Sequence, residues 1–263
     1  MKKLLIISML MLLITCAFAE RKALVIANWN YANTILKSPS ADADSMQKAL
    51  VDFGFNVKRF NNLNLASLGA AIDSFAIKVK SVDEVVVYYS GHGANLNSIN
   101  YLAPANVDLS NAQTYTKTCY NLGTLATKVK AAKTSIIIAE ANKLWAPIGS
   151  KSGVPKSFTT MKAASANQMI IFSAEPGKAV QNSSLSYSLF TSALISKING
   201  TEAGVNQFIP SMIGEMDKST NSLQKPWFSG PLKTDFFFLT SEIKSMWKRM
   251  DTMEIEGGGS LSW

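Results

Sequence analysis

Short apolar runs alternate with segments of helical periodicity along most of this chain. Apolar residues recur every three or four positions at 41–53, 65–79, 122–132, 185–198, 205–217 and 241–253, which predicts helices there. Strands are predicted at 22–28, 55–60, 84–89, 135–139, 169–173 and 235–239, and residues 100–103 are compatible with a further short strand. We therefore expect a mostly parallel, about six-stranded sheet in a three-layer α/β/α sandwich.

The first twenty residues, MKKLLIISMLMLLITCAFAE, have the pattern of an export signal. Two lysines precede an apolar run that ends in Ala17-Phe18-Ala19, an A-x-A cleavage site. The run is too short and wrongly flanked for a membrane span. Cleavage after Ala19 predicts a periplasmic or secreted protein. In the alternative, Cys16 is lipidated and the product is a lipoprotein. We expect association with a membrane only in that case.

Charge and cysteine content narrow the function classes. The 26 Lys and Arg outnumber the 18 Asp and Glu, but the basic residues are scattered in short clusters such as Lys58-Arg59. A nucleic-acid surface usually shows a concentrated basic patch, so we predict no nucleic-acid partner. Cleavage after Ala19 leaves Cys119 as the single cysteine, which excludes an internal disulfide. A buried packing role is the simplest interpretation of Cys119. We predict no cofactor and no metal.

The single histidine lies where a predicted strand ends. His92 closes the sequence VVVYYSGHG, and Asn142 closes TSIIIAEAN after another apolar run. Parallel strands end at the same edge of a sheet, where α/β folds bind their ligands. We therefore expect His92 and Asn142 to lie side by side. The polar loop that follows His92 is of the kind that contributes to such sites.

Several motifs, in this order and spacing, resemble the caspase-like peptidases of the bacterial metacaspase type. These are KALVIAN, SADADSMQKALVDFGFNVKRF, VVVYYSGHG, INYLAPANVD, MIIFSAEPGKAV, LFTSALISKI and LQKPWFSGPLKTDFFFL. After the signal peptide at 1–19, the resemblance implies one caspase-like domain over 20–240. This domain has a large-subunit-like part at 20–142, a linker at 143–167 and a small-subunit-like part at 168–240. A C-terminal helix and flexible tail then occupy 241–263.

The resemblance also locates a changed nucleophile. In this family the nucleophilic cysteine belongs to an Asp-Ala-Cys-Arg motif about fifty residues after the histidine. Here the motif reads Glu140-Ala141-Asn142-Lys143, and Asn142 follows His92 by 142 − 92 = 50 residues. A thiolate is the attacking group in this chemistry, and a carboxamide offers no comparable nucleophile. The resemblance implies that His92 is a relic general base, that Asn142 occupies the position of the missing cysteine, and that the Gly93 backbone contributes to an oxyanion hole.

We interpret the chain as an exported caspase-like pseudo-peptidase that binds a peptide or protein in a relic groove. The groove is expected to include Asn28, Tyr31, Ser173 and Ala174. One alternative is an active cysteine endopeptidase with an unusual nucleophile, for which Cys119 and Ser90 are weak candidates. Another is an envelope scaffold protein. The acidic pocket residues that select Arg or Lys in the family do not map clearly onto the chain, and the ligand and oligomeric state stay open.

Overall fold

A six-stranded, mostly parallel sheet forms the centre of the protein. The computed structural model describes residues 19–256 except 33, 108–114, 142–156 and 181–185. The sheet has the order β11-β10-β9-β5-β1-β4. Five strands are parallel and the edge strand β11 is antiparallel, which confirms the expected sheet. The strands are β1 (Arg21–Ala27), β4 (Asn56–Asn61), β5 (Glu84–Ser90), β9 (Thr134–Glu140), β10 (Gln168–Phe172) and β11 (Trp227–Phe228).

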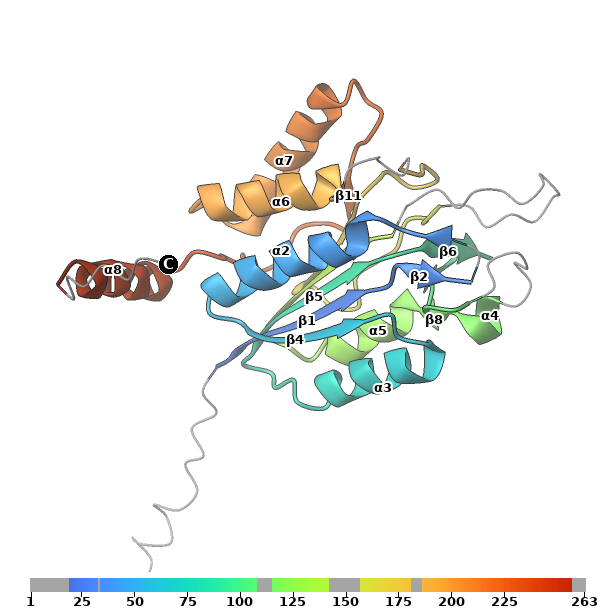
Figure 1. Ribbon diagram of the computed structural model, residues 1–263, viewed down its shortest axis with the longest axis horizontal. Helices are drawn as coiled ribbons and strands as arrows, with labels where there is room; N and C mark the ends of the chain where they lie inside the picture. Colours follow the sequence, from blue (N-terminus) through green and yellow to red (C-terminus); the bar gives the residue numbers. More distant parts are fainter. Residues whose placement is uncertain (1–18, 33, 108–114, 142–156, 181–185, 257–263) are drawn as a thin grey trace, which may run out of the picture.

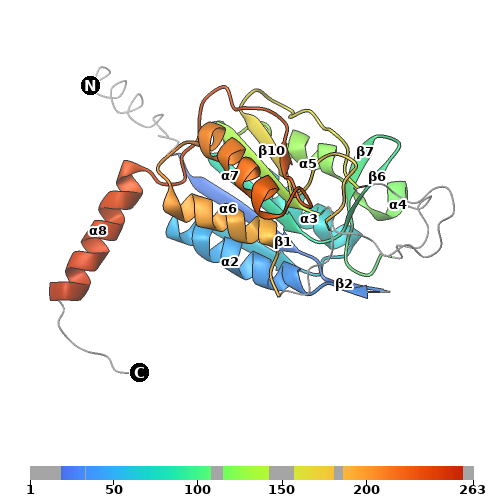
Figure 2. The same ribbon diagram turned by 90° about the horizontal axis from the view of Figure 1, so that it is seen from above.

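Helices cover both faces of this sheet, as a three-layer sandwich requires (Figures 1 and 2). One face carries α2 (Ser38–Asp52), α6 (Leu189–Gly200) and α7 (Val205–Ser219), and the other carries α3 (Leu65–Ala76) and α5 (Leu122–Val129). Successive strand residues point to opposite faces. In β5, Val86 and Tyr88 join the core under α2 and α6, whereas Val85 and Val87 join the core over α3 and α5. Burial on both faces explains why these strands are continuous apolar runs.

The chain that follows His92 forms a small antiparallel sheet. Its strands are β6 (Gly93–Leu96), β7 (Ile99–Leu102) and β8 (Tyr120–Asn121), and α4 (Tyr115–Thr118) precedes β8. Asn97 and Ser98 join β6 to β7 with φ values of 51° and 62°, the left-handed pair of a tight hairpin turn. A second hairpin, β2 (Asn30–Tyr31) with β3 (Thr34–Ile35), lies at the same end of the main sheet (Figure 1).

One predicted strand is wrong, because residues 235–239 form no strand. Phe236 and Phe238 are buried and Phe237 is 44 % exposed, which gives the alternation of a strand. Their carbonyl groups, however, have partners outside any sheet. Phe236 accepts the Val205 N–H, and the guanidinium of Arg21 donates to the carbonyls of Phe237 and Phe238.

The C-terminal helix α8 (Ser241–Glu256) packs on its own domain through its first turns. Ile243 is buried, and the Trp247 indole lies 5.4 Å from the Phe53 ring and donates to the Asp52 carbonyl at 3.1 Å. Gly54 makes room for this contact, since a Cβ there would lie 2.8 Å from Ile243 Cδ1 and its φ is +77°. Figure 2 shows the rest of α8 extending away from the sheet.

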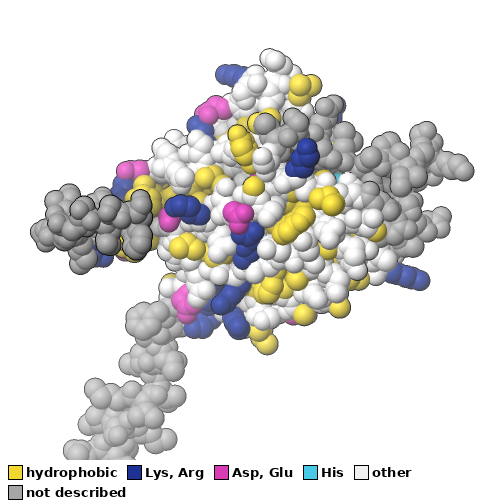
Figure 3. All heavy atoms as spheres, viewed as in Figure 1, with side chains coloured by type: hydrophobic (Ala, Val, Ile, Leu, Met, Phe, Trp, Pro, Cys, Tyr) yellow, Lys and Arg dark blue, Asp and Glu magenta, His cyan; other side chains and the backbone are white. Residues whose placement is uncertain are grey.

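Charged side chains are spread over the surface. On the face shown in Figure 3, Lys and Arg lie scattered, several of them beside acidic groups. Ion pairs join Lys48 to Asp52 and Lys128 to Asp73. Over the described ranges, no helix combines the length and the apolar character that crossing a bilayer requires.

Candidate functional site

His92 lies at the carboxyl edge of the sheet, two residues after the end of β5, and its side chain is buried with 1 % of the residue exposed. Both backbone polar groups of His92 form hydrogen bonds. The His92 N–H donates to Tyr31 Oη at 2.8 Å, and its carbonyl accepts from Tyr89 Oη and from the Ala103 N–H, each at 3.0 Å. The Tyr31 ring stands 4.7 Å from the imidazole. The fold therefore fixes the position of the histidine tightly.

Asn28 and Tyr31, predicted to line the groove, support this histidine loop. The fully buried Asn28 amide donates to the Ala103 carbonyl at 3.1 Å and accepts the Leu63 N–H at 2.9 Å. Tyr31 Oη donates to the Asn28 carbonyl at 3.1 Å while it accepts from His92. Burial raises the pKa of Tyr31 well above its usual value, so the phenol stays a hydrogen-bond donor. A ligand contact from either residue stays a prediction.

The β5 and β9 ends approach each other beyond the sheet. Ser90 and Glu140 are partners in the strand register, and the Gly91 N–H donates to the Glu140 carbonyl at 3.2 Å. A Cβ on Gly93 would lie 2.9 Å from the Ala141 Cβ. Gly93 thus sits against the residue that precedes position 142. Asn142 itself lies outside the described residues, so its placement beside His92 and its role stay predictions.

We expect Gly93→Ala to destabilise the protein by about 1–3 kcal/mol, because the added methyl group overlaps the Phe158 ring as well as Ala141. Gly214→Ala is the matched control. A Cβ there meets nothing within 4 Å, and alanine favours the interior of α7 by up to about 1 kcal/mol. Urea unfolding of the two variants measures both effects. Equal free energies of unfolding for the two variants would show that Gly93 is not closely packed against Phe158 and Ala141.

The other two predicted groove residues follow β10. Ser173 continues the strand, with its N–H donating to the Ala139 carbonyl at 3.3 Å and its carbonyl accepting from Gln224 at 2.9 Å. The Ser173 hydroxyl is buried and has no hydrogen-bond partner among the described residues. Ala174 is also buried. Ser173 and Ala174 therefore lie at the same sheet edge as His92, on the side of β9 away from β5.

A buried acidic cluster of Asp42, Ser90 and Glu140 lies at this edge, on the face covered by α2 and α6. All three residues are fully buried. Ser90 Oγ donates to Asp42 Oδ2 at 3.4 Å, and Asp42 Oδ1 accepts the N–H of Ser188, the N-cap residue of α6, at 2.7 Å. Burial, followed by the charges of Asp42 and Glu140, raises the pKa of Tyr88 well above its usual value. Two carboxyl groups are therefore buried near the histidine loop.

This cluster was not predicted from the sequence, although two of the motifs that resemble the family contain its residues. Asp42 lies in the motif SADADSMQKALVDFGFNVKRF, and Glu140 ends an otherwise apolar strand. A charged residue in a fully buried strand is rare unless it is paired or functional, and that was the available signal. The parallel register then aligns Ser90 with Glu140, and α2 carries Asp42 over them.

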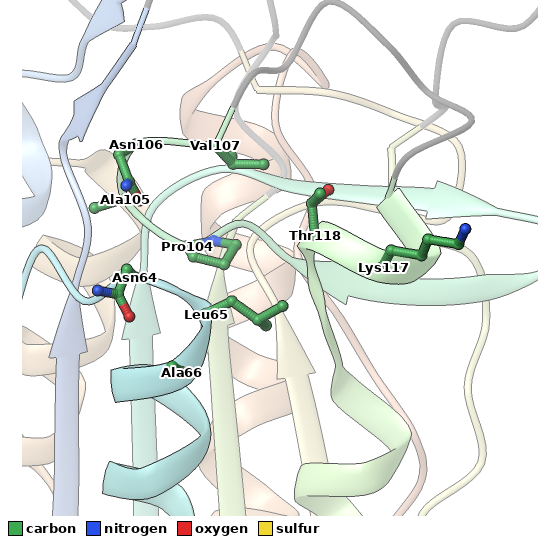
Figure 4. A pocket seen from close by; sticks show the side chains of 9 residues that line it. All are labelled: Asn64, Leu65, Ala66, Pro104, Ala105, Asn106, Val107, Lys117 and Thr118. Carbon is green, nitrogen blue, oxygen red and sulfur yellow. The ribbon is translucent and has the colours of Figure 1, made fainter.

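A separate cavity of about 460 Å³ lies on the α3 side of the sheet edge (Figure 4). Its walls are mainly apolar, with Pro104 and Leu65 facing each other and the Lys117 side chain directed away from them. None of the predicted site residues that the structure describes lines it. Among the described residues, no group of three or more His, Cys, Asp or Glu side chains is arranged to hold a metal.

Cys119 is poorly suited to nucleophilic attack. The residue is buried, packs in the same apolar cluster as Tyr31, and lies 3.9 Å from the Thr118 hydroxyl. Burial raises the pKa of its thiol to about 11. Only about one molecule in ten thousand would then carry the reactive thiolate at neutral pH.

Fold and site together define an α/β domain with a histidine at the carboxyl edge of a parallel sheet. The family model of the caspase domain matches residues 20–237, and this chain belongs to the caspase-domain family. A search of curated proteins found no match.

Proposed function

We propose that this protein is an exported caspase-like pseudo-peptidase that binds a peptide or protein segment at the carboxyl edge of its sheet without cleaving it. The observation that carries the proposal is the position of Asn142. It follows His92 by 50 residues, in the place where the family has its cysteine. A carboxamide forms no acyl-enzyme, whereas the backbone around His92 keeps an ordered, hydrogen-bonded geometry.

The properties of Cys119 argue against the alternative of an active endopeptidase with a different nucleophile. Its thiol is buried and its pKa is raised to about 11. An activated catalytic cysteine has the opposite properties, with a lowered pKa and an accessible sulfur. Ser90, the other candidate, lies inside the sheet, where its hydroxyl donates to Asp42.

The acidic cluster indicates the charge of the ligand. Asp42 and Glu140 place two carboxyl groups next to Ser90, and Glu140 lies one strand away from the buried Ser173 hydroxyl. Negative charge in a medium of low dielectric acts strongly on a nearby cation. We therefore propose that the bound segment carries an Arg or Lys side chain.

A peptide ending in arginine should bind at least about tenfold more tightly than the same peptide ending in glutamine, because one buried charge interaction contributes on the order of 1.4 kcal/mol. Fluorescence anisotropy with labelled peptides measures both affinities, and chromatography of the same samples measures cleavage. Asp42→Asn should remove most of the preference while it retains an oxygen for the Ser188 N–H. Asp44→Asn, on the exposed face of α2, is the matched control.

Two outcomes would contradict the proposal. Peptide turnover by the wild-type protein that is lost in His92→Ala would identify an active peptidase. Equal binding of the two peptides would show that the acidic cluster does not select the ligand.

Export is part of the proposed function. The lysine pair, the apolar run and the A-x-A site at 17–19 support cleavage after Ala19 and a periplasmic or secreted product. Lipidation of Cys16 is the competing product. Mass spectrometry of the protein recovered from its source cells distinguishes them, because a lipid anchor adds several hundred daltons.

A further inference from the structure

The first residues of the folded domain meet a buried carboxylate. Ala19 and Glu20 are exposed, and β1 begins at the next residue. The Glu20 backbone N–H donates to Asp83 Oδ1 at 3.1 Å. Asp83 is fully buried and directly precedes β5. The nitrogen that makes this bond is the atom that cleavage after Ala19 would turn into the N-terminus.

We propose that Asp83 is the binding site for the N-terminal ammonium that removal of the signal peptide creates, so that processing itself stabilises the fold. The inference rests on the proposed export. A signal peptidase hydrolyses the Ala19–Glu20 bond with one water molecule. The leader then ends in the Ala19 carboxylate, and Glu20 begins with an α-ammonium group.

The geometry around Asp83 suits an ammonium ligand. Asp83 Oδ2 accepts from Lys22 Nζ at 2.6 Å and from the Lys80 N–H at 2.8 Å, whereas Oδ1 accepts from Glu20. The Glu20 carbonyl accepts the Glu84 N–H at 3.0 Å, which fixes the nitrogen beside the carboxylate. Charging this donor turns a hydrogen bond from a neutral amide to the carboxylate into an ion pair in which both partners are charged.

The surrounding charges tolerate one more cation. The Glu20 carboxylate lies 3.5 Å from Lys22 Nζ and 3.9 Å from Lys80 Nζ, so it offsets the repulsion between these lysines and the new ammonium. Next to them, Glu84 pairs with Arg21 and Lys133. Ion pairs at this end of the chain therefore join the acids Glu20, Asp83 and Glu84 to the bases Arg21, Lys22, Lys80 and Lys133.

The stabilisation has a defined pH window. Burial alone would raise the pKa of Asp83, but the bonds from Lys22 and from the Lys80 and Glu20 N–H groups lower it overall. The Asp83 contribution is therefore present above its unfolded pKa of about 4 and is lost as the pH falls further. An ammonium beside a carboxylate has a raised pKa, so its contribution is complete below the unfolded value of about 8 and is lost at higher pH.

The test compares two forms of the mature chain, residues 20–263, that differ only at the N-terminus. One carries the free α-amine and the other is Nα-acetylated. At pH 6 we expect the free form to have a folded-to-unfolded ratio about fivefold higher and a Tm about 2–4 °C higher. The difference should vanish at pH 10, where the amine is neutral. In Asp83→Asn the two N-terminal forms should have equal stability.

The comparison between N-terminal forms needs no substitution, so it remains informative if Asp83→Asn fails to fold. Equal stability of the free and acetylated chains at pH 6 would overturn the ammonium site and leave the export proposal standing. N-terminal sequencing of the exported protein tests the other premise. A first residue other than Glu20 would overturn both the cleavage site and this inference, whereas Glu20 with the expected stability difference supports both.

Discussion

Asn142→Cys should convert the wild-type protein, which we expect to leave peptides intact, into a peptidase. Loss of the nucleophile in comparable catalytic groups costs on the order of a millionfold in turnover. The restored cysteine would follow His92 by 50 residues, and Gly93 already lies against Ala141 at the start of that segment. We expect cleavage of peptides with Arg or Lys before the scissile bond to rise at least about a hundredfold over wild type, which requires the thiolate and imidazole to recover only a small part of the lost rate.

Fluorogenic peptides with basic and acidic residues at the cleavage position provide the measurement. The double variant His92→Ala/Asn142→Cys is the control, and it should lose the gained activity because the thiol then lacks its base. Asn142→Ser tests whether the gain depends on a thiol. Inactivity of Asn142→Cys in a folded protein would mean that more than the nucleophile has changed, and activity in wild type would refute the pseudo-peptidase.

Local patterns in the sequence predicted the main sheet well, because a strand buried on both faces must be apolar throughout. Residues 84–89 and 135–139 both have this character, and both form central strands, β5 and β9. The expected convergence at the carboxyl edge follows from parallel pairing, which the register of Ser90 with Glu140 provides. The position of His92 was therefore predictable.

The acidic cluster and the small β6–β7–β8 sheet were not predictable in the same way. Asp42 reads as an ordinary polar helix position, and only the packing of α2 on β5 brings it to Ser90. The β6–β7 hairpin turns at Asn97-Ser98, which lacks the glycine that usually marks such a turn. Long-range packing, which a single sequence does not display, decides the acidic cluster. In the small sheet, only β7 (Ile99–Leu102) corresponds to the short strand expected at 100–103.

The same limit explains the misassigned segment at 235–239. An alternating Phe236-Phe237-Phe238 run fits a strand, but the carbonyl groups of Phe237 and Phe238 bond to a side chain. That side chain is Arg21, at the start of β1 and 216 residues before Phe237. In the sequence, Arg21 precedes a lysine at the start of a strand, as an exposed arginine would. In the structure its side chain is only 13 % exposed and binds the other end of the domain.

Arg21→Ala should therefore destabilise the protein strongly, by about 3 kcal/mol, which corresponds to a fall in Tm of about 6–12 °C. The guanidinium donates to the carbonyls of Phe53 at 3.0 Å and Phe238 at 2.7 Å, and pairs with Glu84 at 2.9 Å. It also lies 5.0 Å from the centre of the Phe55 ring. Removing it leaves several partly buried acceptors without their donor, and urea unfolding measures the cost.

Arg21→Lys and Lys48→Ala separate the causes. A lysine keeps the charge but cannot reach three carbonyl groups at once, so Arg21→Lys should retain most of the loss. Lys48, whose side chain is 78 % exposed, pairs with Asp52 four residues along α2, so its removal should cost at most about 0.5 kcal/mol. A loss in Arg21→Ala no larger than in Lys48→Ala would show that the carbonyls of residues 237–238 find other donors. A much larger loss in Arg21→Ala than in Lys48→Ala would show that the Arg21 guanidinium takes the place of a strand partner for residues 237–238. This side chain then holds the end of the caspase domain against β1.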